Sequence, residues 1–79
     1  MPVEIWWVES WDDESDEALG EARSLKLFAP TPAEGVALCE KVRGYAQAQY
    51  GRGELVLLDA NGRRCAGRIP VAELLGAAA

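Results

Sequence analysis

Seven carboxylates crowd the stretch from Glu9 to Glu21, and their charge is the first chemistry that this sequence offers. No basic residue precedes Arg23, so residues 1–21 carry a net charge of −8, whereas residues 22–79 carry +3. The acidity is therefore a local feature of a chain whose overall charge is −5. Clustered carboxylates can hold a metal ion, bind a basic surface, or keep a loop solvated.

A metal site is the least supported of these three. Calcium loops place their ligands at alternate positions and need a turn glycine, as in D-x-D-x-D-G, whereas DDESDEALG has a different spacing. The chain has no histidine, and Cys39 and Cys65 lack CxxC spacing, which excludes zinc sites of the Cys/His type. We therefore expect no metal and no other cofactor.

The spacing of the acids favours a basic partner. As an extended loop, residues 12–17 would span about 20 Å and carry five charges, or one charge per ~4 Å. This is close to the ~3.4 Å between phosphates along one DNA strand, so the row could occupy a basic nucleic-acid channel and compete for it. The alternative is a solvated loop that only aids solubility.

Tryptophans beside the acids would supply apolar anchors for such a partner, because tryptophan is enriched at the energetic centres of interfaces. We place Trp7 in the core and Trp6 on the opposite face. The predicted partner-binding residues are Glu9, Trp11, Asp12, Asp13, Glu14, Asp16, Glu17, Glu21 and Trp6. At a pI of 4.6 the chain itself is a poor candidate for direct nucleic-acid binding.

The sequence contains no recognisable catalytic set. There is no histidine base, no nucleophile elbow and no glycine-rich phosphate loop. One enzymatic alternative is Pro2, which after removal of Met1 would be a secondary amine of the kind that small tautomerases use as a base. Eight carboxylates nearby in the sequence would repel an anionic substrate, so we expect a protein that is not an enzyme.

Hydrophobic patterning predicts a single domain over residues 1–79 with four strands and one main helix. The capping box Thr31-Pro32-Ala33-Glu34 begins the helix and Gly51 ends it. Repulsion among the acids favours a long hairpin loop with at most one helical turn near residues 15–19, although a short helix is an alternative. The expected strands are 3–9, 22–29, 54–60 and 63–69, the helix is 32–50, and the acidic loop is 10–21.

This order, ββαββ, predicts an α+β fold with the helix packed on one face of an antiparallel or mixed sheet in the order 2-1-3-4. A two-residue turn at Asn61-Gly62 would place Leu58 opposite Cys65 and Val56 opposite Gly67, with Val56, Leu58, Cys65 and Ile69 facing the helix. The expected residues of the other face are Trp6, Val8, Phe28, Leu55, Leu57, Arg64 and Arg68. Residues 70–75 would form a short C-terminal helix or an ordered tail.

An uncovered second face would itself be an interaction surface. The alternative to a charge-based inhibitor is therefore a homodimeric structural module that uses this open sheet face, and we expect a monomer or a weak homodimer. No apolar run approaches the ~20 residues that span a bilayer, and no signal peptide is evident, so we expect no membrane association. Two reduced cysteines are typical of the cytoplasm, here of a bacterial host cell.

The acidic hairpin segment WDDESDE, the capped helix TPAEGVALCEKVRGYAQAQY and the closing hairpin LVLLDANGRRCAGRI together make a chain that resembles the small phage-encoded anti-CRISPR proteins. The likeness covers nearly the whole chain, in architecture and charge but without a shared motif. It implies a stoichiometric inhibitor that binds a CRISPR-Cas complex and blocks its basic DNA-binding surface by charge mimicry.

Overall fold

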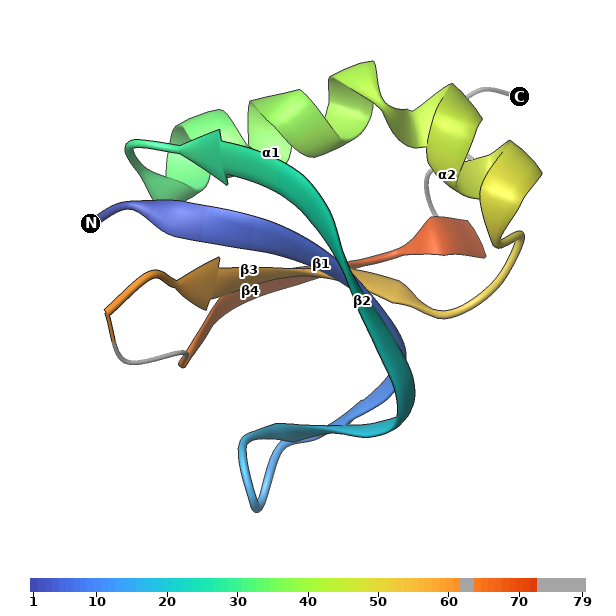
Figure 1. Ribbon diagram of the computed structural model, residues 1–79, viewed down its shortest axis with the longest axis horizontal. Helices are drawn as coiled ribbons and strands as arrows, with labels where there is room; N and C mark the ends of the chain where they lie inside the picture. Colours follow the sequence, from blue (N-terminus) through green and yellow to red (C-terminus); the bar gives the residue numbers. More distant parts are fainter. Residues whose placement is uncertain (62–63, 73–79) are drawn as a thin grey trace.

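The computed structural model describes residues 1–61 and 64–72, which form one sheet with a helical layer on one side (Figure 1). The sheet order is β2-β1-β3-β4, and each neighbouring pair is antiparallel. The predicted α+β fold and strand order are therefore confirmed. The elements are β1 (Val3–Asp12), β2 (Glu17–Ala29), α1 (Pro32–Lys41), α2 (Arg43–Gln49), β3 (Glu54–Asp59) and β4 (Cys65–Pro70).

The helical layer begins as the sequence predicts. The Thr31 hydroxyl accepts a hydrogen bond from the backbone N–H of Glu34 at 3.2 Å, and Pro32 fills the first helical position. The expected continuous helix over 32–50 is wrong in one respect, because Val42 leaves helical geometry and separates α1 from α2. Val42 and Gly44 both have low helix propensity, which weakens the helix at this point.

The main core lies between this layer and the sheet. Val3, Ile5 and Trp7 point from β1 toward the helices, and Trp7 is only 2% exposed, as predicted. The Trp7 indole stacks on Tyr50 with ring centroids 4.3 Å apart, and its N–H donates to the Arg52 carbonyl at 2.8 Å. Burial of so large an aromatic ring with its N–H satisfied fixes the middle of β1 against the C-terminal end of α2.

The predicted faces of β3 are inverted. Leu58 does pair with Cys65, but Leu57 then pairs with Gly67 and Val56 with Arg68, because a bulge adds one residue to β4. A shift of one residue exchanges the two faces of a strand relative to its neighbour. Leu55 and Leu57 lie under the helices because they pair with Trp7 and Ile5 of β1, and the bulge brings Ile69 opposite Leu55. Val56 and Leu58 lie on the opposite face.

The acidic segment is a folded hairpin, so the expected loop over 10–21 and helical turn near 15–19 are both wrong. β1 continues to Asp12, β2 begins at Glu17, and only residues 13–16 form the turn. Trp11 pairs with Ala18 and both pack against Val8, Val56 and Leu58. Apolar burial on the second sheet face thus outweighs repulsion between exposed carboxylates, which amounts to only a few tenths of a kcal/mol per pair.

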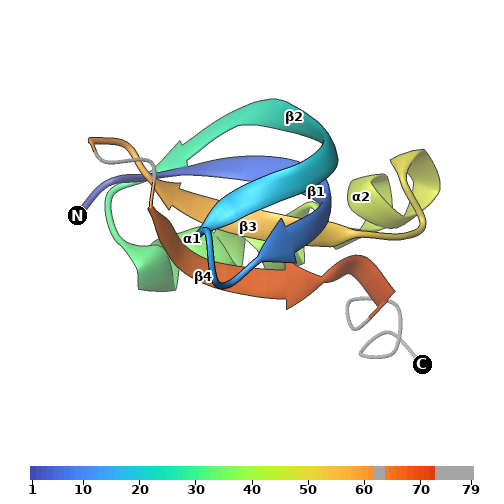
Figure 2. The same ribbon diagram turned by 90° about the horizontal axis from the view of Figure 1, so that it is seen from below.

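Bulges let the hairpin reach that face. β2 has 13 residues against 10 in β1, and the ladder is irregular between Ile5 and Trp6 and again between Val8 and Ser10. Lys26 and Gly20, with φ of 58° and 79°, lie on β2 at these two places. Bulged strands bend and twist more strongly, and Figures 1 and 2 show the hairpin curling beneath the sheet on the side away from the helices.

The end of the described chain is also held in place. Val71 is buried, and its N–H donates to the Gly53 carbonyl at 2.9 Å. The predicted turn at Asn61-Gly62 and the predicted C-terminal segment fall partly outside the described residues. Within the described part of the chain, no helix has the length and apolar character needed to cross a membrane.

The close packing of α1 on the sheet yields a stability prediction for Gly35. A Cβ atom there would lie 2.7 Å from Leu57 Cδ2 and 2.9 Å from Val3 Cγ2, whereas at Gly44 it would meet nothing within 4 Å. Both Gly→Ala changes gain helix propensity, so urea unfolding should find Gly35→Ala less stable than Gly44→Ala by about 1–3 kcal/mol. Equal free energies of unfolding would contradict the packing described.

Candidate partner-binding site

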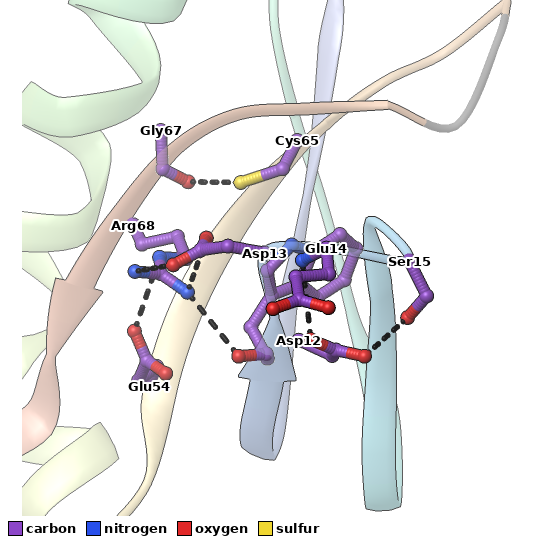
Figure 3. Close-up of polar contacts among 9 residues, drawn as sticks. Asp12, Asp13, Glu14, Ser15, Glu54, Cys65, Gly67 and Arg68 are labelled. Atoms are coloured by element: carbon purple, nitrogen blue, oxygen red, sulfur yellow. Dashed lines mark hydrogen bonds and ion pairs between the residues drawn. The ribbon is translucent and has the colours of Figure 1, made fainter.

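The hairpin tip is a tight turn organised by Asp12. Its carboxylate accepts hydrogen bonds from the Glu14 backbone N–H at 3.1 Å and from the Ser15 hydroxyl at 2.7 Å (Figure 3). These bonds, that from Ser15 foremost, hold the pKa of Asp12 below its usual value, so this carboxylate stays charged at neutral pH. Asp16 closes the turn with a left-handed φ of 56°, a conformation that aspartate tolerates better than most residues.

Arg68 ties this tip to the far edge strand. Its guanidinium lies 3.1 Å from Asp13 Oδ1 and 3.5 Å from Glu54 Oε1, and it donates to the Trp11 carbonyl at 3.4 Å. Figure 3 shows Arg68 of β4 reaching toward Asp13 on one side and Glu54 on the other. One partly exposed arginine therefore connects the β1–β2 hairpin with β3 and β4.

The predicted acidic residues divide into two groups according to their contacts. Besides Asp12 and Asp13, two acids nearer the base of the hairpin have partners. Glu21 lies 2.5 Å from the Arg23 guanidinium, and Glu9 lies 3.9 Å from that of Arg52. These four carboxylates therefore have partners within the protein.

The other three predicted acids face solvent. Glu14, Asp16 and Glu17 are exposed, and their carboxylates form no hydrogen bond or ion pair with the described residues. We call these three residues the acidic tip. Like charges this close are kept together by the turn and by the strand pairing behind it, rather than by mutual attraction.

Trp6 and Trp11, the predicted apolar anchors, lie on the concave side of the hairpin. Both are half-buried against the cluster of Val8, Val56 and Leu58. An open hollow of about 250 Å³ remains between the curled hairpin and the sheet, with Asp16 and Glu17 at its border. The structure thus brings Trp6 and Trp11 together with Asp16 and Glu17. The predicted residues Glu9 and Glu21 lie apart from them, beside Arg52 and Arg23.

Arg68 is the residue that sequence reasoning assigned too small a role. The alternation of β4 correctly places it on the second face, but it was not among the predicted partner-binding residues. Its contact with Asp13 depends on the curl of the hairpin, for which Gly20 in an otherwise strand-like run was the available signal.

Among residues 1–61 and 64–72, no three carboxylate or thiol side chains converge in a way that could hold a metal ion. Comparisons with protein-family models, curated proteins and solved structures found no match to this chain.

The arginine contact can be tested by comparing Arg68→Gln with Arg64→Gln, a neighbouring exposed arginine that forms no ion pair with the described residues. Loss of two ion pairs and the hydrogen bond to Trp11 should reduce the free energy of unfolding by about 1 kcal/mol. In a domain of this size that lowers Tm by about 4–8 °C, while Arg64→Gln should change stability by less than about 0.5 kcal/mol. Identical melting of the two variants would show that Arg68 does not hold the tip.

Proposed function

We propose that this protein is a non-enzymatic inhibitor that binds the basic, nucleic-acid-binding surface of another protein through the acidic tip. The observation that carries the proposal is the display of Glu14, Asp16 and Glu17 on a folded turn, without internal partners among the described residues. A solvated loop loses conformational entropy when it binds, whereas a turn already fixed by Asp12 and Arg68 loses little.

Because the acidic segment is a hairpin, its charges do not imitate the phosphates of a DNA strand as one extended row. The carboxylates do not follow one another along an extended row, because the chain reverses direction between Asp12 and Glu17. They form a compact anionic group, which suits a cluster of arginine and lysine side chains that otherwise grips one or two phosphates. Exposed charges of this kind mainly accelerate association, so inhibition should weaken as salt increases.

The two thiols support a role in binding rather than catalysis. Burial, with a smaller effect of Glu40, raises the pKa of Cys39 to about 11, and desolvation raises that of Cys65 as well. At neutral pH both groups are therefore protonated, and neither is the reactive thiolate that nucleophilic catalysis needs. They also lie on opposite faces of the sheet, Cys39 in the main core and Cys65 paired with Leu58.

The finer proposal follows the resemblance to anti-CRISPR proteins: the partner is a CRISPR-Cas complex in the cytoplasm of a bacterial host, and the acidic tip blocks the surface that binds target DNA. The small size, the charged tip and the absence of a visible catalytic set in the sequence all suit a stoichiometric inhibitor.

The alternative, a homodimer through the second sheet face, is a simpler assembly to test. The hairpin occupies part of that face with Trp11 and Ala18, which leaves less apolar surface for a second copy. Analytical ultracentrifugation at micromolar concentration would show a dimer if the alternative is right.

Neutralising the acidic tip should abolish inhibition. The variant Glu14→Gln/Asp16→Asn/Glu17→Gln leaves Asp12 and Asp13 in place to hold the turn. Purified CRISPR-Cas complexes of several types would be mixed with labelled target DNA and increasing amounts of this protein, and DNA binding measured by fluorescence anisotropy. The variant should need at least about tenfold more protein for the same inhibition, equivalent to about 1.4 kcal/mol.

A matched control makes the same change in net charge elsewhere: Glu34→Gln/Glu40→Gln/Asp59→Asn, in α1 and β3. This control should inhibit as the unmodified protein does. Equal loss in both variants would mean that only total charge matters, and absence of inhibition by the unmodified protein with every complex would reject the anti-CRISPR proposal.

A further inference from the structure

The hollow beneath the hairpin is lined on one side by the sheet and on the other by the curled end of β1. Trp6 and Val8 of β1 and Leu58 of β3 line the sheet side, and Trp11 lines the side where β1 curls over. We call this space, of about 250 Å³, the tryptophan hollow. Its lining is mostly apolar, and indole rings come from two positions five residues apart on one strand.

The hollow stays open because the apolar side chains that β2 contributes to it are both alanines. Ala18 and Ala22 lie along its edge where a larger residue would fill the space. Asp16 and Glu17, two of the three residues of the acidic tip, form its border. An occupant would therefore meet aromatic surface inside and two carboxylates without internal partners at the entrance.

This combination matches the chemistry of an arginine side chain. A guanidinium is planar and weakly hydrated, so it can stack on an indole ring while its N–H groups bind carboxylates, and its methylene stem suits an apolar lining. A lysine ammonium is a compact and strongly hydrated charge, which would remain at the acidic border instead. Aromatic and acidic groups thus favour the same occupant.

From this charge complementarity and the aromatic lining, we infer that the tryptophan hollow binds an arginine side chain of the partner protein. The inference rests on the proposed function, in which the acidic tip meets a basic protein surface. It adds that one arginine of that surface enters the hollow and anchors the complex, while the other basic residues contact Glu14 and its neighbours from outside.

The probes are hexa-arginine and hexa-lysine peptides, each titrated into the isotope-labelled protein by NMR. Hexa-arginine should bind about fivefold more tightly, because stacking on an indole adds to charge attraction. It should shift the indole N–H signals of Trp6 and Trp11 but not that of Trp7, which is buried on the opposite face. Equal affinity of the two peptides, or shifts confined to the acidic tip, would overturn the inference.

Ala22→Leu fills the hollow without changing charge, and Ala48→Leu on α2 is the control at an exposed alanine outside it. The first change should reduce the affinity for hexa-arginine about fivefold, to that for hexa-lysine, and the second should change neither affinity. Unaltered hexa-arginine binding by folded Ala22→Leu would also overturn the inference.

The two proposals fail separately. Neutralising the acidic tip should reduce the affinity for both peptides to the same extent. If it does so while Ala22→Leu has no effect, the binding role of the acidic tip is supported and the arginine site is rejected. Failure of hexa-arginine to bind rejects the arginine site, whereas the assay with CRISPR-Cas complexes decides the proposed function independently.

Discussion

β1 is apolar on both of its faces, and the rest of the structure follows from the need to cover it twice. Val3, Ile5 and Trp7 face the helices, while Trp6 and Val8 face the other way. A chain of 79 residues with one helical layer can cover only one face with helices. The second cover comes from the strand itself, because its C-terminal end curls back together with β2. Trp11 and Ala18 thereby cover Val8, Val56 and Leu58, which would otherwise be exposed.

This self-covering hairpin decides where the negative charge lies. Once Trp11 is anchored under the sheet, the residues that follow must form the turn outside it, and Asp12 and Asp13 become part of the scaffold through Ser15 and Arg68. The remaining acids project from a fixed position beside the tryptophan hollow. The acidic residues are therefore held on a folded hairpin rather than on a mobile, solvated loop.

Much of the architecture could be predicted from local signals. The capping box at Thr31 is a short-range hydrogen-bonding pattern, and the choice of Trp7 for the core follows from strand alternation beside Ile5. The extension of the strands into the acidic hairpin could not be predicted, because repulsion among neighbouring charges is visible in the sequence, whereas the compensating burial of Trp11 on Val56 and Leu58 is a long-range contact.

The faces of β3 were mispredicted for a related reason. An extra residue in β4 leaves no mark in a run such as CAGRI, yet it inverts the relation between the two strands. Local hydrogen-bonding patterns were therefore predictable here, whereas bulges and the contacts they permit were not.

The central claim is that the carboxylates are displayed on a folded hairpin rather than on a solvated loop. Backbone amide hydrogen exchange, followed residue by residue by NMR, tests this most directly. Amides of residues 10–12 and 17–19 that are hydrogen-bonded across the hairpin should exchange far more slowly than an unstructured chain, together with those of the central sheet. Exchange of all these amides at the unstructured rate, while β3 stays protected, would contradict the account.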